Sequence, residues 1–188
     1  DTNTVYTIMN MNSKKAIGYY NSSSESGTQL VQKEYNASVA DAHQRWRIIF
    51  VGERIGGDFG YYKIRSNRSA TKKHVIDIKD WSLSQGGMAI AFDGDGGTNE
   101  QFFFEYAGEG SYYIRSRHSG LYLEVAGRSL SNNANIQQGT YTGGDYQKWK
   151  LIPYRSPMES SVSVAPTDLK AENMPAAVKL TWTASVSS

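Results

Sequence analysis

Several short patterns in the sequence combine residue types that can bind a metal ion. Asp93-Gly94-Asp95-Gly96-Gly97 resembles the start of a calcium-binding loop, in which spaced carboxylates supply oxygen ligands. It lacks the ligand at the fifth position and the closing Glu of such a loop, so we interpret it as a hairpin turn. His43, His74 and His118 stand at no metal-ligand spacing, and the chain contains no Cys. We therefore predict no metal site and no other cofactor.

Patterns typical of catalysis are equally weak. We find neither the sharp Gly-x-Ser-x-Gly turn that exposes a nucleophile nor a glycine-rich loop that cradles phosphate. Acidic residues from different parts of the chain could act as a general acid and base, but nothing in their placement indicates it. Lys72-Lys73-His74 could contact an anionic ligand, although a solvated loop is the simpler interpretation. The sequence therefore predicts no catalytic residues and no enzyme activity.

Composition excludes further classes of protein. The 188 residues include 20 Lys plus Arg and 18 Asp plus Glu, a net charge of +2 that does not suggest a nucleic-acid binder. The longest apolar run, 48–51, is far too short to cross a membrane. The excess of 13 Tyr over 6 Phe, among many Asn, Ser and Gly, favours short strands joined by tight turns.

The chain repeats itself three times. Each unit begins with a Tyr-containing strand and a Ser-rich turn, continues through two short apolar strands, and closes with Gln, one residue, and an aromatic residue. The second of the apolar strands is centred on Leu30, Ile90 and Ile136. Leu30 follows Gly18 by 12 positions, and Ile136 follows Glu124 by 12, whereas Ile90 follows Asp77 by 13. The closing motifs are Gln44/Trp46, Gln101/Phe103 and Gln147/Trp149.

These patterns predict an all-β fold. Alternation of apolar and polar residues over short runs is typical of antiparallel strands, and no stretch has the apolar period of a helix longer than one turn. One unit is too small to bury its own apolar face, so we expect three units to share a core in a closed threefold arrangement. Trp46, Phe103 and Trp149 are predicted core anchors, and the amides of Gln44 and Gln101 are predicted to satisfy buried backbone groups.

With these motifs the chain resembles the ricin-type β-trefoil lectins and related bacterial carbohydrate-binding modules. The resemblance implies a β-trefoil of twelve strands with pseudo-threefold symmetry over 1–154. Its repeats cover about 4–52, 60–107 and 111–154. A linker at 155–165 then precedes a segment, 166–188, that looks like the first two strands of a fibronectin type III domain.

In that family each repeat's pocket has an Asp after the first hairpin strand and a Gln on the second strand. An aromatic residue follows two positions later, and an Asn stands beside the closing Gln. Carried over to the third repeat, the resemblance places Glu124, Gln137, Gly139 and Tyr146 at these positions. Gln147 closes that motif, and Tyr141, two residues beyond Gly139, could supply the missing ring.

The other repeats depart further from the family pattern. In the second repeat the resemblance keeps Asp77, places Ala91, Asp93 and Glu100 at the other positions, and leaves Trp81 in the following loop as a replacement ring. The first repeat has Gly18, Val31, Lys33 and His43 there, with Tyr35 nearby, so its pocket is predicted to be lost or altered. The third repeat is therefore the first choice for a working site and the second repeat is next.

The resemblance implies a non-catalytic module that binds a mono-, oligo- or polysaccharide. Such a module would belong to a larger exported bacterial protein, at the cell surface, in the periplasm or outside the cell, and would hold an attached catalytic or adhesive domain against a glycan. The alternative is a β-trefoil kept for protein contact or as a spacer, with eroded sugar sites. The losses at Gly18, Val31, Ala91 and Gly139 favour that alternative.

Overall fold

A computed structural model describes residues 4–23, 25–36, 42–56, 59–68, 73–154, 167–174 and 177–183. The side chains of 53–56, 59 and the last two ranges lie outside that description, as do Lys72 of the basic pattern and the interval 155–166. By their contacts the residues fall into two compact units, Asp1–Tyr154 and Arg155–Ser188. Each unit is considered by itself.

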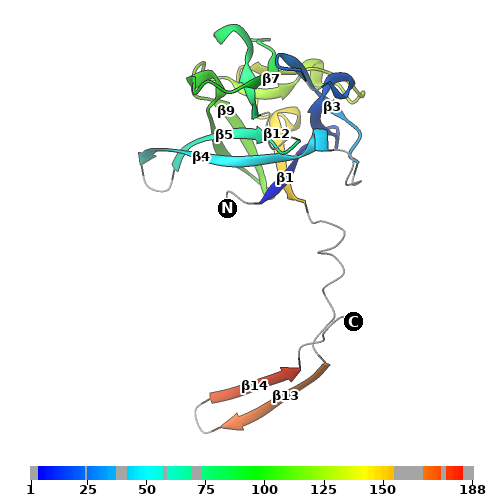
Figure 1. Cartoon of the computed structure of the whole chain (residues 1–188), viewed down its shortest axis with the longest axis vertical. Helices are drawn as coiled ribbons and strands as arrows, with labels where there is room; N and C mark the ends of the chain where they lie inside the picture. Colours follow the sequence, from blue (N-terminus) through cyan, green and yellow to red (C-terminus); the bar gives the residue numbers. More distant parts are fainter. Residues whose placement is uncertain are drawn as a thin grey trace. The chain divides into compact units, whose positions relative to one another are not determined.

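Six antiparallel strands form a closed ring in the first unit (Figure 1). In ring order the neighbours are β1 (Val5–Asn10), β4 (Trp46–Gly56), β5 (Phe59–Ser66), β8 (Phe102–Gly108), β9 (Ser111–Ser116) and β12 (Lys148–Pro153), which returns to β1. Because every strand is paired on both sides, the ring leaves no open sheet edge.

Three two-stranded hairpins complete the fold, one from each repeat. They are β2 (Ala16–Tyr19) with β3 (Thr28–Lys33), β6 (His74–Ile78) with β7 (Ala89–Asp93), and β10 (Tyr122–Val125) with β11 (Ile136–Gly139). Twelve strands in three groups of four confirm the predicted β-trefoil.

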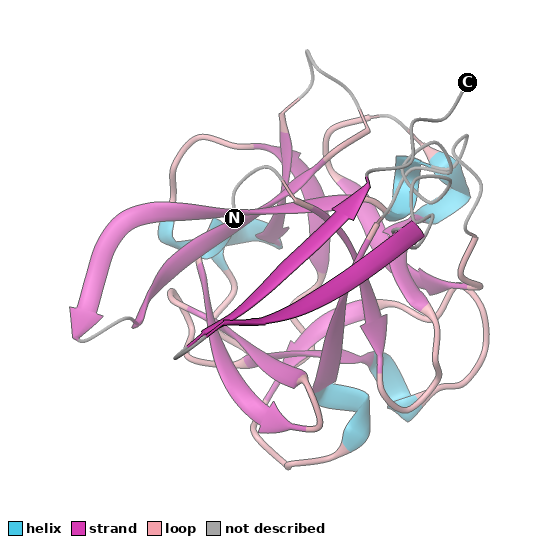
Figure 2. Cartoon of the chain, turned by 90° about the horizontal axis from the view of Figure 1, so that it is seen from below, coloured by secondary structure: helices cyan, strands magenta, loops and turns pink. Residues whose placement is uncertain are grey.

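Helical structure in the described residues is limited to six single 3₁₀ turns, as the sequence predicted (Figure 2). Three of them follow the first strand of each hairpin: η1 (Tyr20–Ser22), η3 (Lys79–Trp81) and η5 (Ala126–Arg128). The other three end at the closing motif: η2 (Ala42–Gln44), η4 (Thr98–Glu100) and η6 (Asp145–Gln147). The last residues of these three turns, Gln44, Glu100 and Gln147, occupy equivalent positions in the three repeats.

The aromatic core anchors are Trp46, Phe102 and Trp149, all fully buried. The indole N–H of Trp46 donates to the Ile17 carbonyl oxygen at 3.1 Å, and Trp149 donates to the Leu123 carbonyl oxygen at 3.0 Å. The predictions for Trp46 and Trp149 are confirmed. Aliphatic side chains from all three repeats surround these rings, among them Ile8, Leu30, Ile64, Ile114 and Ile136.

The prediction that Phe103 anchors the core is wrong. Phe103 is half-buried and lines a small cleft with Tyr61 and Arg115, while its neighbour Phe102 fills the core. The three consecutive aromatic residues 102–104 show no alternation, so the sequence pattern could not fix which side chain faces inward. A shift by one residue on a strand moves every side chain to the other face.

One side chain joins the three hairpins at the pseudo-threefold axis. The amide nitrogen of Gln29 lies 2.7, 2.9 and 3.1 Å from the carbonyl oxygens of Leu30, Ala89 and Ile136. These three residues are structurally equivalent and fully buried. The residue of the second hairpin that is equivalent to Leu30 and Ile136 is therefore Ala89 and not, as predicted, Ile90.

The second unit contains an antiparallel pair, β13 (Thr167–Met174) and β14 (Ala177–Thr183), with Glu172 opposite Lys179. Its likeness to the start of a fibronectin type III domain stays a prediction.

Candidate functional site

Strand register shows which residues of the three hairpins are equivalent. Gly18 stands opposite Val31, Asp77 opposite Ile90, and Glu124 opposite Gln137. The separation is 13 positions in every repeat, so the second strand of the second repeat was aligned one residue too late. The position predicted to hold Ala91 holds Ile90, and the aromatic position two residues later holds Phe92 in place of Asp93.

The same shift applies to the closing motif of the second repeat. Glu100 occupies the position of Gln44 and Gln147 at the end of its 3₁₀ turn, and Asn99 occupies the Asn position that the sequence assigned to Glu100. Gln101 is buried and donates to the Gly96 carbonyl oxygen at 3.0 Å, so its amide satisfies a backbone group as predicted. It stands one residue after the position that Gln44 and Gln147 occupy in their repeats. The second repeat thus has an Asp, an aromatic residue and an Asn at three of the four pocket positions.

Asp77 and Asn99 form a direct pair at the end of the β6–β7 hairpin. The side-chain amide of Asn99 donates to Asp77 Oδ2 at 2.7 Å and to the Ile78 carbonyl oxygen at 3.2 Å. Both side chains are largely buried, at 5 % and 3 % exposure. Among the described residues Asn99 Oδ1 has no hydrogen-bond partner. A buried acceptor without a partner is costly, and a ligand hydroxyl could supply the missing donor.

Two exposed rings stand close to this pair. Phe92 shares the hairpin face with Asp77 and Ile90 because side chains alternate along a strand, and it is 38 % exposed. Trp81, 48 % exposed, lies against Gly97: a Cβ atom there would come within 2.7 Å of the indole and 2.4 Å of Asn99 Oδ1. Gly97 therefore lets the indole approach Asn99.

His118 of the third repeat supports this indole. Its ring meets that of Trp81 edge-on at 5.0 Å, and its Nε2 lies 3.0 Å from the Trp81 carbonyl oxygen. The Trp81 ring is therefore held by a residue of a neighbouring repeat, a contact that no motif within one repeat could predict.

Acidic groups around Asp77 oppose its ionisation. The pKa of Asp77 is raised to about 7. Burial is the largest cause and the charges of Glu100, Asp95 and Asp80 add to it, whereas the hydrogen bond from the Asn99 amide lowers the pKa. Glu100 is itself buried, accepting from the backbone N–H of Asp95 and Gly96 and pairing with Lys63 Nζ at 3.0 Å. A raised pKa in a partly open polar site is a common property of functional carboxylates.

The third repeat has a different arrangement. Glu124 Oε1 accepts from the Gln137 amide at 2.9 Å, and its Oε2 accepts from the Gln147 amide at 2.8 Å. A Cβ atom on Gly139 would lie 2.4 Å from the Glu124 carboxyl carbon. The structure brings these predicted residues together, but Glu124 is 7 % exposed and both of its oxygens are engaged by the protein.

The predicted ring of the third repeat is exposed and belongs to a tyrosine cluster. Tyr141, 57 % exposed, packs on Tyr113 at 5.1 Å and on Tyr122 at 5.2 Å between ring centroids. Tyr146, at the Asn position, is buried, and its hydroxyl lies 2.6 Å from Thr142 Oγ1.

In the first repeat two side chains crowd the position of the acid. A Cβ atom on Gly18 would lie 3.3 Å from Lys33 Cδ and 3.3 Å from Gln44 Cγ. Gln44 is buried and donates to the Glu34 carbonyl oxygen at 2.6 Å, which confirms its predicted structural role. No carboxylate stands opposite Val31, as the sequence predicted.

Comparison with known proteins identifies the family. The family described as ricin-type beta-trefoil lectin domain-like matches residues 1–92 and 98–166. The chain belongs to the ricin-type β-trefoil lectin family. Domains of this family are in general non-catalytic carbohydrate binders. No curated protein matched the chain.

Several solved structures share the fold of this chain. The designed 3-fold symmetric protein ThreeFoil is 33 % identical with a TM-score of 0.69, over 79 % of this chain and 97 % of that one. An exo-beta-1,3-galactanase from Clostridium thermocellum is 33 % identical with a TM-score of 0.72; 80 % of this chain matches only 30 % of the enzyme. The Macrolepiota procera ricin B-like lectin in complex with lactose is 16 % identical, with a TM-score of 0.61 over 81 % and 96 %.

The Asp93-to-Gly97 pattern forms a turn in the described residues. Asp95 Oδ1 accepts from the Gly97 N–H at 2.9 Å, as in a simple turn, and no group of three possible metal ligands occurs within the described ranges. No helix in the described part of the chain is long and apolar enough to cross a membrane.

Proposed function

We propose that this chain is a non-catalytic carbohydrate-binding module whose principal site is the second-repeat pocket of Asp77, Asn99, Phe92 and Trp81. The observation that carries the proposal is the buried Asp77–Asn99 pair, with an unpartnered Asn99 oxygen, beside two exposed rings. Membership of the lectin family supports this interpretation.

The chemistry of the pocket suits a sugar. An ionised Asp77 has two oxygens that can accept from neighbouring hydroxyl groups, while Asn99 Oδ1 can accept from another. The faces of Trp81 and Phe92 offer apolar surface to the C–H groups of a pyranose ring. A sugar with a hydroxyl in the wrong orientation would leave a buried polar group without a partner, which is how such a pocket discriminates between epimers.

The neutral sugars are the first class to test. The acidic groups around Asp77, namely Glu100, Asp95 and Asp80, would repel a carboxylate or sulfate. Related lectins of known structure were solved with lactose and with GalNAc, at 16 % and 14 % identity. Galactose-type neutral glycans are therefore the first candidates for this pocket.

The third-repeat residues Glu124, Gln137 and Gln147 hold the β10–β11 hairpin to the closing motif in this proposal, because their polar groups engage one another. The exposed Tyr141 stays a predicted contact for a longer glycan that extends beyond one pocket.

The wider setting of the module is also proposed. The match to 30 % of a galactanase supports a module joined to a catalytic or adhesive domain that it holds near a glycan. We propose that the module is exported from a bacterial cell, because its proposed carbohydrate target lies outside the cytoplasm. Weak individual sites are effective in such proteins because attachment raises the local substrate concentration.

Glycan-array screening of the 188-residue chain, followed by calorimetry with the strongest neutral hit, tests the proposal. We expect Asp77→Asn and Trp81→Ala each to reduce affinity by about tenfold or more, the loss expected for a removed charge-assisted hydrogen bond or stacking surface. Asp145→Asn, an exposed acid of the third repeat, is the matched control and should bind like the wild type.

Two outcomes would reject this function. Absence of binding to every glycan, together with a measurable protein partner, would support the protein-contact or spacer alternative. Turnover of a chromogenic glycoside that disappears when a carboxylate is amidated would show an enzyme instead.

A further inference from the structure

The outer wall of the six-stranded ring, from β4 across β5 and β8 to β9, is rich in basic side chains. Trp46, Ile64 and Ile114 lie in the core, so their strand neighbours at odd-numbered positions face outward, because side chains alternate along a strand. Five of these outward positions on β4 and β5, on β9 and directly after β9 are basic, and we call them the basic wall: Arg47, Lys63, Arg65, Arg115 and Arg117.

Two arginines of the basic wall stand directly opposite each other. Arg47 of β4 is the partner of Arg65 of β5 in the strand register, and both residues are half-buried. Arg47 Nε donates to Asn67 Oδ1 at 2.8 Å, which fixes the side chain near the strand. Like charges that face each other across a strand pair destabilise a sheet. An anionic partner bound over these side chains would relieve that repulsion.

A small cleft of about 130 Å³ lies on the same wall, where β5, β8 and β9 meet. It is lined by two aromatic residues, two arginines and two small residues: Tyr61, Phe103, Arg115, Arg117, Ser116 and Gly120. Phe103 stands opposite Arg115 in the strand register. Arginine and aromatic side chains are the residue types that are enriched at protein–protein interfaces and contribute most to their affinity.

Contacts within the protein hold both guanidinium groups of the cleft in position. Arg117 Nη1 donates to Gln101 Oε1 at 2.7 Å, and its guanidinium carbon lies 4.4 Å from the centroid of the Tyr61 ring. Arg115 Nη1 donates to Glu105 Oε1 at 3.3 Å. A side chain that is already oriented loses less conformational entropy when it binds a ligand. The cleft is therefore prepared for an anionic group.

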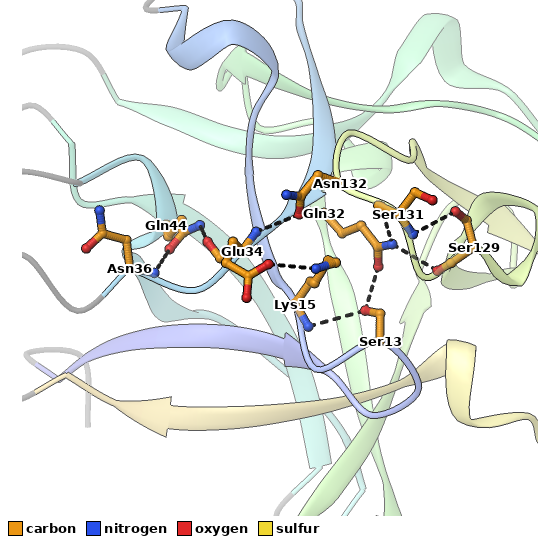
Figure 3. A network of polar contacts seen from close by, with 9 residues as sticks. All are labelled: Ser13, Lys15, Gln32, Glu34, Asn36, Gln44, Ser129, Ser131 and Asn132. Atoms are coloured by element: carbon orange, nitrogen blue, oxygen red, sulfur yellow. Dashed lines mark hydrogen bonds and ion pairs between the residues drawn. The ribbon is translucent and has the colours of Figure 1, made fainter.

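Charges at another boundary between repeats are arranged differently. Where the first repeat meets the third, the Lys15 ammonium pairs with the Glu34 carboxylate at 2.8 Å (Figure 3). The basic wall also contains ion pairs, such as that of Arg115 with Glu105. What sets the wall apart is that like charges stand together, because one arginine pair is directly opposite in the register and Arg117 is two residues from Arg115.

We propose that the basic wall is a docking surface for an acidic segment of a partner protein, with a carboxylate of that segment bound between Arg115 and Arg117. The planar guanidinium group can bond to a carboxylate through two parallel N–H groups, and the other basic side chains attract further acids. Apolar side chains of the segment pack against Tyr61 and Phe103. The surface goes beyond the proposed function, because it uses different residues from the second-repeat pocket and a different class of ligand.

Fluorescence anisotropy of the 188-residue chain with a labelled peptide of alternating Glu and Ser tests the proposal, with the peptide of alternating Gln and Ser as its neutral counterpart. We expect the acidic peptide to bind more tightly, with an affinity that falls as the salt concentration rises. Arg115→Gln, at an exposed side chain, should weaken its binding by about tenfold through the loss of a charge-assisted hydrogen bond. Arg117→Lys keeps the charge but not the planar group, and it should weaken binding severalfold.

The controls separate this surface from the sugar site. Arg128→Gln makes the same change at an exposed arginine of the η5 turn and should leave peptide binding unchanged. Neutral-glycan affinity should stay the same in Arg115→Gln, and its loss there would place Arg115 in the sugar site instead. Equal affinity for the two peptides, or acidic-peptide binding that Arg115→Gln does not reduce, would overturn the proposal. Tighter binding of a single-stranded DNA oligonucleotide than of the acidic peptide would also overturn it, in favour of a nucleic-acid surface.

Discussion

The second and third repeats place a carboxylate at the same point of the same hairpin, with different consequences. Asp77 pairs with one amide, that of Asn99, next to two exposed rings. Glu124 bonds to two amides, those of Gln137 and Gln147, and both of its oxygens are occupied. The first arrangement leaves hydrogen-bonding capacity for a ligand, and the second uses it inside the protein.

Two substitutions together account for this difference. Glu is one methylene longer than Asp, and in the third repeat its carboxyl group fills the space over Gly139, where the second repeat has Phe92. The absence of a ring gives the longer side chain room to reach Gln147. A carboxylate at this position can therefore either remain available to a ligand or support the hairpin, although Asp and Glu look similar in the sequence.

The largest expected effect tests the register on which this comparison depends. Phe102→Ala removes a fully buried ring from the core and should lower the free energy of unfolding by about 3–5 kcal/mol. Phe103→Ala removes a half-buried ring and should cost about 1 kcal/mol. Urea denaturation of both variants measures the difference, and a larger cost for Phe103→Ala would contradict the register.

Sequence reasoning predicted the trefoil, because three repeats with matching turns and closing motifs leave few other arrangements. It located Asp77, Glu124, Gln137 and Gln147 for the same reason. It missed Phe92 and Asn99, because consecutive apolar residues at 89–92 and 102–104 carry no alternation to fix which residue faces inward. The residue at the acid position and the residue opposite it on the second hairpin strand are 13 positions apart in every repeat: 18 and 31, 77 and 90, 124 and 137. This constant separation was the signal that could have corrected the alignment.

The contacts between repeats could not be predicted at all. His118 supports Trp81, and Asn132 meets the strand end at Glu34, across boundaries between repeats. Neighbouring repeats contribute these residues, so no motif within one repeat records the contact.

A substitution at Glu124 tests whether the third repeat binds the glycan or only supports the fold. Glu124→Ala leaves the amides of Gln137 and Gln147 without their shared acceptor, so unfolding should become easier by about 1–3 kcal/mol. Affinity for the neutral glycan should stay within twofold of the wild type. Loss of that affinity in a folded Glu124→Ala protein would return the principal site to the third repeat.

The pH dependence of binding tests the role of the Asp77 carboxylate. The proposed neutral-glycan site uses the ionised form of Asp77, whose pKa is raised to about 7 by burial and nearby acids. Affinity should therefore fall by about tenfold when the pH is lowered from 8 to 6, as protonation removes the acceptor. Calorimetry at several pH values measures it, and affinity unchanged over this range would show that Asp77 does not hold the sugar.

The smallest effect concerns stability and has the opposite sign. Because the folded-state pKa of Asp77 lies above its ordinary value, the folded state loses stability as the pH rises from about 4 to about 7. Asp77→Asn removes that cost and should stabilise the protein by about 1 kcal/mol at pH 8, with little effect at pH 4. Denaturation at both pH values checks this, and a variant destabilised at pH 8 would show that the carboxylate supports the fold.

The most direct test of the second-repeat site is a heteronuclear NMR titration of the 188-residue chain with the best neutral glycan from the array. The signals of the Trp81 indole N–H and the Asn99 side-chain amide should move with added sugar, while the amides of Gln137 and Gln147 stay in place. Movement of the two Gln amides with Trp81 and Asn99 unchanged would contradict the assignment of the sugar site to the second repeat.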